Sequence, residues 1–427
     1  MESSVSCTIG DLCDSGLADL QTGPFGSQLH ASDYSAEGVA VVPTEAIAER
    51  RIDHCLLPRV GEAKARELRR HRLEPGDILF ARRGAQATGR VALVRPTEDG
   101  FLCGTGAIRL RLHGDVSSDY VSHILSSPAT REWLRTHAIG ATMPNLNKAV
   151  IRSVPLRLLP LPEQQAVARF LSAFDDKIEL NRRMSRTLES IVRTIFKSWF
   201  VDFDPVRWKV EGGEVGLPPD IADLFPKALD IDVGIPLGWD LCELGDVVTV
   251  HQQTAGPREI EHEIVDYYSI PAFDKGRLPS IVTGSAIGSS KYVMPAGCVL
   301  ISRLNPRIPR AWLPRPAQGR RRVCSTEFLV LTTKERVTPE FLYGLSCSDR
   351  FRDELASRVT GTSGSHQRVR SGDALSILVP LPPSSLPEAY SIRVASLLDL
   401  GDCLLDTGRA LKSTRDALLP HLVAGHG

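Results

Sequence analysis

Arginine side chains are concentrated in two segments that contain no acidic residue, residues 78–97 and 299–326. The planar guanidinium group can bind guanine O6 and N7, or a phosphate, through two parallel hydrogen bonds, and Gln or Asn can read adenine. These segments therefore predict contact with DNA, although a solvated basic loop without a partner is the alternative. Six side chains are the candidate DNA contacts: Arg82, Arg83, Gln86, Arg303, Asn305 and Arg307.

Motifs for catalysis, nucleotide binding and metal binding are missing from the sequence. There is no G-x-x-x-x-G-K-[ST] phosphate loop and no His pair with metal-ligand spacing. A DNA amino-methyltransferase needs an Asn-Pro-Pro-aromatic type of motif, and the nearest string, Asn305-Pro306-Arg307-Ile308, predicts only a turn. The acidic pair Asp175-Asp176 is expected on the exposed side of a helix. We therefore expect a protein that is not an enzyme and holds no metal or cofactor.

The overall composition gives no general attraction to nucleic acid, because 51 basic residues are balanced by 51 acidic ones. A DNA-binding face must then be local. The nine cysteines form no C-x-x-C pair, no apolar run reaches the length of a membrane span, and the sequence starts without a secretory leader. These features predict a cytoplasmic protein with no membrane contact.

The two arginine segments lie at the same place in an internal repeat. Gly76 and Gly297 are 221 residues apart (297 − 76), and the same offset pairs Arg82 with Arg303. Strands are expected at Asp77–Ala81, Arg90–Val94 and Ala107–Leu112 in the first copy, and at Cys298–Ser302 and Glu327–Leu331 in the second. One helix is expected at Ser118–Thr136, with a twin at Thr338–Ser357. Each copy is therefore predicted to be an α+β domain.

A long helix with a heptad seam is expected after each domain. At 1.5 Å per residue, a helix from Glu163 to Phe200 would be roughly 55 Å long. Such helices fit best as a mutual antiparallel pair that acts as a spacer, with Asn181 as a register device; separate packing of each on its own domain is the alternative. Gly401 and Gly408 are expected to interrupt the second helix. The main seam positions are Leu171, Phe174, Ile178, Asn181, Leu188, Leu397, Leu404, Leu411 and Leu418.

The predicted organisation is an α+β protein with a pseudo-twofold internal repeat. Two similar domains are held apart by a coiled-coil spacer of two long antiparallel helices. The expected bounds are 1–160 for the first domain, 161–204 for its helix, 205–235 for a linker rich in Pro, Gly and acidic residues, 236–384 for the second domain and 385–427 for its helix.

Three strings resemble the specificity subunit of type I restriction-modification systems. They begin at Thr22 (TGPFGSQL), Leu159 (LPLPEQQ, leading into FLSAFDDKIELN) and Phe196 (FKSWFVDFDP), and Ile235-Pro236-Leu237-Gly238-Trp239 resembles the entry to the family's second domain. The second copy departs from the pattern, since Leu381-Pro382-Pro383-Ser384 replaces the Pro-Glu-Gln-Gln start.

The resemblance implies a non-catalytic subunit with two target-recognition domains, each reading one half of an interrupted double-stranded DNA site. It also implies that the helices dock two methyltransferase subunits and that restriction (motor-nuclease) subunits join the complex. Methyl donor, ATP and magnesium would then belong to those partners. The family's base-reading residues vary with the target, so none is carried over. A protein-interaction scaffold that does not bind DNA is the alternative function.

Overall fold

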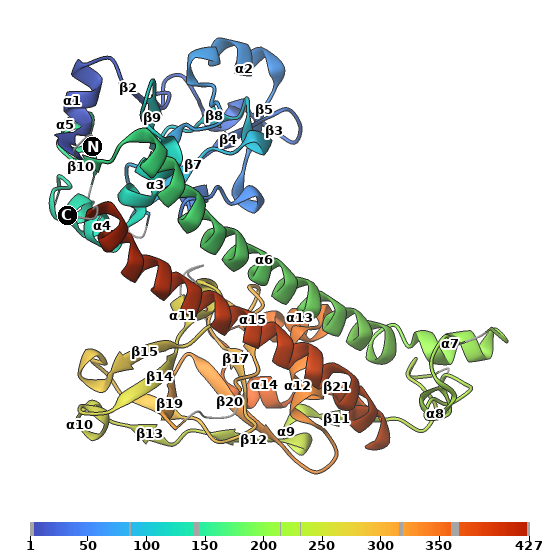
Figure 1. Ribbon diagram of the computed structural model, residues 1–427. Helices are drawn as coiled ribbons and strands as arrows, with labels where there is room; N and C mark the ends of the chain where they lie inside the picture. Colours follow the sequence, from blue (N-terminus) through green and yellow to red (C-terminus); the bar gives the residue numbers. More distant parts are fainter. Residues whose placement is uncertain are drawn as a thin grey trace. The chain divides into compact units, whose positions relative to one another are not determined.

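The computed structural model describes residues 4–84, 87–140, 145–213, 215–230, 232–315, 319–359 and 367–424. Among the candidate DNA contacts, Gln86 lies outside these residues. The chain divides into two compact units, which are described separately (Figure 1). Unit 1 comprises Met1–Ile178 with Arg409–Gly427, and unit 2 comprises Glu179–Gly408.

Unit 1 is built on two four-stranded sheets. The first is antiparallel, in the order β2 (Ala18–Thr22), β9 (Ala107–Leu112), β6 (Ile78–Ala81), β7 (Val91–Leu93). The second has the order β3 (Tyr34–Ser35), β5 (Arg59–Val60), β4 (Val39–Val42), β8 (Leu102–Cys103), with β4 parallel to β8. The apolar side chains of β6, such as Phe80, are fully buried between these sheets and the neighbouring helices.

Unit 2 repeats this arrangement. Its antiparallel sheet has the order β12 (Val248–His251), β20 (Phe328–Thr333), β17 (Val299–Ser302), β18 (Ala311–Trp312). Its five-stranded sheet has the order β13 (Thr254–Ala255), β16 (Lys291–Val293), β19 (Arg321–Cys324), β14 (Ile264–Tyr268), β15 (Ser280–Thr283), again with one parallel pair, β14 with β19. The predicted α+β class and the internal repeat are confirmed.

The helix expected at Ser118–Thr136 is two helices, α3 (Ser118–Ser126) and α4 (Pro128–Thr136). Its twin is likewise divided into α12 (Pro339–Cys347) and α13 (Asp349–Ser357). The break falls at Ser127 and at Ser348, whose hydroxyls accept hydrogen bonds from backbone amides of the next helix. A serine in this N-cap role stops one helix and starts another, so the prediction of one helix was wrong.

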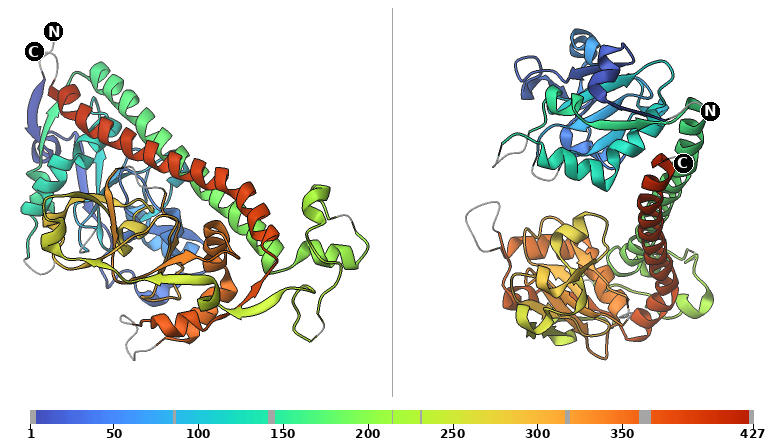
Figure 2. Two further views of the ribbon diagram at one scale, coloured as in Figure 1. Left: turned by 90° about the horizontal axis from the view of Figure 1, so that it is seen from below. Right: turned by 60° about the vertical axis from the view of Figure 1, so that its left-hand side comes forward.

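The two long helices are α6 (Leu161–Phe200) and α15 (Ser385–Ala424), each of 40 residues. Within unit 2 they run side by side and antiparallel (Figure 2). Asn181 Nδ2 donates to the Leu404 carbonyl at 3.3 Å, and the Tyr390 hydroxyl donates to the Val192 carbonyl at 3.3 Å. Later residues of α6 therefore pair with earlier residues of α15, as the sequence predicts.

The glycines of α15 do not interrupt it, so that expectation was wrong. The helix runs through Gly401 and Gly408, and both are buried. A Cβ atom on Gly401 would lie 3.4 Å from Ser185 Oγ, so two small residues bring the helices into close contact. The glycines reduce intrinsic helix propensity but permit this approach.

The buried line of each helix is offset from the predicted seam. On α6, Leu171, Ile178 and Asn181 are buried, whereas Phe174 and Leu188 are half-buried. On α15 the leucines Leu397, Leu404, Leu411 and Leu418 are all half-buried. Four of the buried residues there recur every seventh position: Val394, Gly401, Gly408 and Arg415. The heptad period is right, and the leucines flank a central line of small and polar residues.

Short helices occupy the segment expected as a linker, namely α7 (Asp204–Val210) and α8 (Pro219–Ala222). Val206, Ile221 and Phe225 from this segment are buried in the core of unit 2. Beyond α8, β11 (Asp240–Glu243) pairs with β21 (Leu378–Leu381); in unit 1, β1 (Val5–Thr8) pairs with β10 (Pro155–Leu158).

Among the helices of the described residues, none is long and apolar enough to cross a membrane.

Candidate functional site

The candidate arginines Arg82 and Arg303 are held by the same backbone hydrogen bonds in the two units. The amide of Arg82 donates to the Gly106 carbonyl at 3.0 Å, and the amide of Arg303 donates to the Glu327 carbonyl at 2.9 Å. The carbonyl of each arginine accepts from a distant amide, that of Leu146 at 2.8 Å in unit 1 and that of Val369 at 3.0 Å in unit 2. The residues that directly follow β6 and β17 are therefore held by matching backbone hydrogen bonds in the two units.

In unit 1 the two candidate arginines differ in their freedom. Arg82 is half-buried, and its Nε donates to Asn145 Oδ1 at 2.9 Å. Arg83 is exposed and lines a pocket whose wall includes Thr44 and Glu45. Gly106 also lines this pocket; a Cβ atom there would lie 2.7 Å from Thr44 Cγ2, so only glycine fits without displacement. Arg83 is the better placed of the two to reach a ligand.

In unit 2 the candidates lie in a turn after β17. Asn305 has a left-handed backbone (φ 47°), which Asn tolerates better than most residues, and its amide donates to the Gln367 carbonyl at 2.9 Å. Among the residues that the structure describes, Arg303 Nε and Asn305 Oδ1 are buried without a hydrogen-bond partner. Arg307, two residues further on, is exposed. Within the part of the chain that the structure describes, this turn has one exposed guanidinium and two buried polar atoms without a hydrogen-bond partner.

Most other arginines of the second basic segment are neutralised by carboxylates from elsewhere in unit 2. Arg310 pairs with Asp274 at 2.7 Å, Arg315 with Asp402 at 3.2 Å, Arg320 with Asp266 at 2.8 Å, and Arg321 with Glu259. Arg322 is buried and donates to backbone carbonyls. The absence of acidic residues along the sequence does not make this segment a basic surface, because its partners are distant in sequence.

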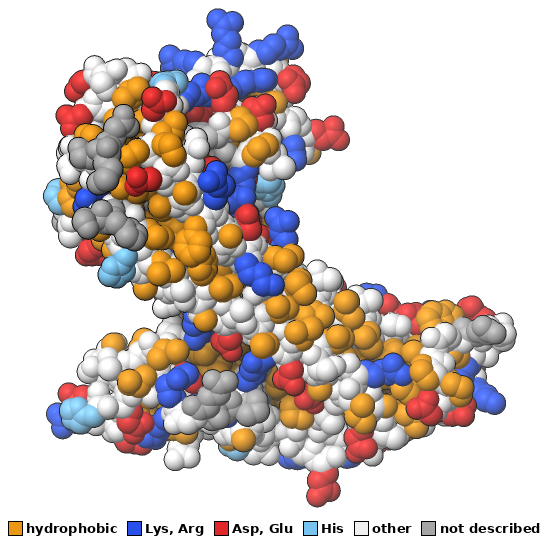
Figure 3. Space-filling model, viewed as in Figure 1, with side chains coloured by type: hydrophobic (Ala, Val, Ile, Leu, Met, Phe, Trp, Pro, Cys, Tyr) orange, Lys and Arg blue, Asp and Glu red, His pale blue; other side chains and the backbone are white. Residues whose placement is uncertain are grey.

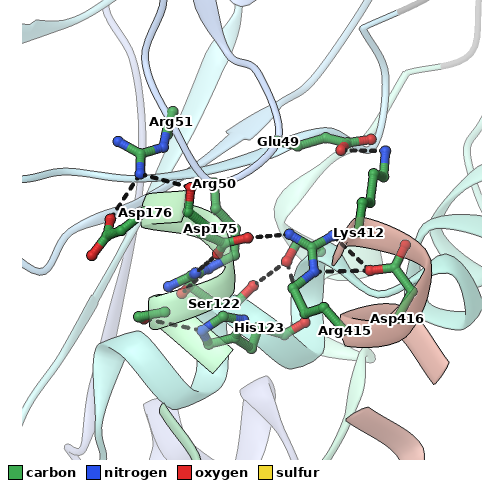
Figure 4. Close-up of polar contacts among 12 residues, drawn as sticks. Glu49, Arg50, Arg51, Ser122, His123, Asp175, Asp176, Lys412, Arg415 and Asp416 are labelled. Atoms are coloured by element: carbon green, nitrogen blue, oxygen red, sulfur yellow. Dashed lines mark hydrogen bonds and ion pairs between the residues drawn. The ribbon is translucent and has the colours of Figure 1, made fainter. Parts of the chain in front are cut away.

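Asp175 corrects the expectation of an exposed acidic pair. It is buried in unit 1, where one carboxylate oxygen accepts from Arg50 and the other accepts from Arg415 of α15 (Figure 4). Arg50 is also fully buried, and its Nε donates to Ser122 Oγ at 3.0 Å. Neighbouring Asp176 is exposed and pairs with Arg51 at 2.9 Å.

Two further groups surround this buried cluster. Glu49 pairs with Lys412 at 2.5 Å and with Arg131 at 2.7 Å. Burial alone would raise the pKa of Glu49, but the two cations lower it to about 2. His123 is buried, and its Nε2 lies 3.2 Å from Ser172 Oγ. Burial, with nearby Arg50 and Arg415, lowers the pKa of His123 to about 2, so the imidazole is neutral.

Unit 2 contains a comparable cluster around Glu189 of α6. Its carboxylate binds Arg277, lies 2.5 Å from Arg193 Nη2, and accepts from the Tyr343 hydroxyl at 2.9 Å. Burial alone would raise the pKa of Glu189, but Arg277, Arg193 and Tyr343 together lower it below its ordinary value. Neither cluster was predicted from the sequence, since the members of each are scattered along the chain.

Apolar side chains remain exposed on the long helices. In unit 2 these are Leu180, Met184 and Ile191 on α6, together with Ile392 and Leu400 on α15. Ile392 is 80% exposed. Figure 3 shows hydrophobic side chains gathered over the helices on the face in view. No group of three potential metal ligands was found among the described residues.

Comparisons with known proteins agree on one family. The model of the type I restriction modification DNA specificity domain matches residues 70–190. Over 459 aligned residues the chain is 23% identical to the type I restriction enzyme HindI specificity subunit of Haemophilus influenzae, covering 92% of this chain and 95% of that protein. It is 25% identical to the MjaIX specificity subunit of Methanocaldococcus jannaschii, covering 73% and 69% respectively.

A solved structure supports the fold. The crystal structure of the type I restriction-modification system S subunit from M. genitalium superposes with a TM-score of 0.52 at 16% identity. The superposition covers 98% of this chain and 96% of that one. The similarity therefore extends over both units and both long helices.

Proposed function

Because the chain belongs to the family of type I restriction-modification specificity subunits, we propose that its two units read DNA, one half of an interrupted target each. The observation that carries this proposal is the duplicated scaffold at the ends of β6 and β17. Equivalent backbone hydrogen bonds place Arg82 and Arg303 at corresponding points. An exposed arginine comes one position later in unit 1 (Arg83) and four positions later in unit 2 (Arg307). A bipartite reader needs such a pair of matching sites.

The chemistry of these two sites suits double-stranded DNA. An exposed guanidinium, as in Arg83 and Arg307, can bind a phosphate or the edge of a guanine. Asn305 Oδ1 is buried, so this side chain would have to turn outward before it could accept from a base amine. Gln86 stays a candidate from the sequence. The neutralised arginines between Arg310 and Arg321 are assigned to structure rather than to DNA contact.

The reactions of the complex are assigned to other subunits. As the family resemblance implies, two methyltransferase subunits would hold the methyl donor, and restriction subunits would use ATP and magnesium. This chain would then be non-catalytic and hold no cofactor of its own. Its contribution would be the choice of DNA sequence.

The exposed apolar residues of the long helices are the proposed docking surface for the methyltransferase subunits. Leu180, Met184 and Ile191 on α6, with Ile392 and Leu400 on α15, expose hydrophobic area that a partner helix would bury. The buried seam residues Leu171, Ile178 and Asn181 would act indirectly, by keeping the helices paired.

Alanine substitution of Arg303 and Arg307 tests the reading of DNA by unit 2. In the purified complex with its methyltransferase, each lost base contact should reduce discrimination at one position by about 1–3 kcal/mol. A lost phosphate contact should instead lower the salt slope of binding by about one. Selection from a randomised duplex library at two salt concentrations measures both quantities.

Arg352→Ala is the matched control, because this arginine of unit 2 is paired with Asp349 on the surface of α13. It should leave binding unchanged. If the double variant also kept its sequence preference and salt slope, Arg303 and Arg307 would not be DNA contacts. If the unaltered complex showed no sequence preference, the chain would instead be an interaction scaffold.

A further inference from the structure

Two arginines with left-handed backbones occupy corresponding places in the two units. Arg50 has φ 56° and Arg277 has φ 57°. Arg50 comes shortly after β4 and the short helix η2 (Thr44–Ala46), and Arg277 comes shortly after β14 and the short helix α11 (Ile270–Asp274). Since β4 and β14 are the strands that form the parallel pair in each unit, the two loops are equivalent parts of the repeat.

A left-handed backbone is unfavourable for arginine. The close approach of Cβ to the following carbonyl costs roughly 1–2 kcal/mol, which glycine avoids. Such a conformation persists where surrounding contacts determine it, and it is often found where a side chain has a specific task. The contacts of Arg50 and Arg277 indicate what that task is.

Both guanidinium groups bind a largely buried carboxylate on α6. Arg50 binds Asp175 (Figure 4) and also donates to Ser122 Oγ at 3.0 Å. A further bond to Asp119 Oδ1 at 3.3 Å gives each of its nitrogens an acceptor. Arg277 binds Glu189, and its guanidinium lies 5.9 Å from the centre of the Phe273 ring. One loop of each globular part is thus tied to the long helix by a directional, charged contact.

Each carboxylate is shared with a second element. Asp175 also accepts from Arg415 of α15, and Glu189 also accepts from the Tyr343 hydroxyl of α12 at 2.9 Å. Apolar packing tolerates sliding of one surface over another, whereas a buried carboxylate with several fixed donors allows few orientations. These contacts therefore favour a single orientation of each globular part on its segment of α6.

We propose that Arg50 and Arg277 are positioning residues that set the orientation of each reading domain on α6, and so the gap in the DNA target. The proposal rests on the proposed function, because the gap has meaning only for a bipartite reader. Neither arginine needs to touch DNA. Loosening either contact should let its domain tilt and accept half-sites at a neighbouring separation.

The test uses the complete complex with its methyltransferase. Arg277→Gly removes the guanidinium and relieves the backbone, and Arg277→Lys keeps the charge but not the planar fork. Methylation is measured on plasmids that carry the two half-sites with the gap altered by single base pairs. Relative to the optimal gap, methylation at the adjacent gaps should rise about tenfold in Arg277→Gly and less in Arg277→Lys. Arg50→Lys provides the corresponding variant in unit 1.

If Arg50 and Arg277 only stabilised the fold, the result would differ. The thermal unfolding temperature and total methylation would fall together, while the distribution of methylation over gap lengths stayed as in the unaltered protein. That result, in both Arg277→Gly and Arg50→Lys, would overturn the proposal. The control variant Arg352→Ala should leave the distribution unchanged. If the unaltered complex methylated no gapped site at all, the proposed function would fail first, and this inference with it.

Discussion

At the scale of single residues, the main feature of this chain is a set of buried charged side chains that bind one another. Asp175 follows Leu171 by four positions and precedes Ile178 by three, so its spacing places it on the buried line of α6. The heptad pattern could therefore have predicted its burial. The partners could not be predicted, because Arg50 and Arg415 are 125 and 240 positions away in the sequence. Only the fold brings them together.

His123 should make the stability of unit 1 depend on pH. Its folded pKa is lowered to about 2, below its ordinary value of 6.5, so at acidic pH the unfolded chain binds a proton that the folded chain excludes. The stabilisation that comes from keeping His123 neutral is present above pH 6.5 and is lost as the pH falls below that value. Between pH 7.5 and pH 5.0 the loss should be about 2 kcal/mol. Urea denaturation at both pH values, monitored in unit 1, measures it.

His123→Gln provides the comparison, because glutamine keeps a hydrogen-bonding group near Ser172 but does not titrate. This variant should lose about 2 kcal/mol less than the unaltered protein over the same pH change. Equal losses in the two proteins would show that other groups dominate the acid sensitivity. His71, whose pKa burial lowers to about 4, would be the next residue to substitute.

At the scale of elements, the regular patterns were predictable and the interruptions were not. The strand Ala107–Leu112 was predicted at its observed bounds, because alternating apolar residues between turns are a direct signal. The long helices were also predicted, from their heptads. The division of α3 from α4 at Ser127 was missed, since the apolar period continues across the break.

The candidate DNA site was only partly predictable from the sequence. Equivalent positions for Arg82 and Arg303 follow from the constant offset between the repeats. The offset does not reveal which arginines are paired with a carboxylate, because carboxylates such as Asp274 and Asp266 come from other elements of unit 2.

Charge on the exposed apolar face of α6 should weaken binding of the methyltransferase. Met184→Glu together with Ile191→Glu replaces hydrophobic area that a partner would bury, worth about 1.5–3 kcal/mol for each fully buried side chain. We expect at least about a tenfold rise in the dissociation constant, measured by calorimetry with the purified methyltransferase.

Arg182→Glu is the matched control for this surface. Arg182 is exposed on the same helix, but two residues before Met184, and so on a different face. It should bind the methyltransferase normally. Comparable weakening by both substitutions would indicate a general charge effect, and no weakening by either would place the docking surface elsewhere.

At the scale of the whole molecule, duplication is the organising feature. Each unit repeats the same antiparallel sheet order, the same parallel strand pair and the same arginine-bearing loops. The copies differ in their polar partners, with Asp175 and Arg415 in one and Glu189 and Tyr343 in the other. Repetition of the scaffold with different side chains is what a protein requires if its two halves read different DNA sequences.

Sequencing of methylated bases in the host genome tests the central claim most directly. With the gene present, we predict a methylated motif of two short half-sites separated by a fixed gap. That motif should disappear when the gene is deleted and return when it is restored. Persistence of every methylated motif after deletion, in a strain where this gene and its methyltransferase are expressed, would contradict the account.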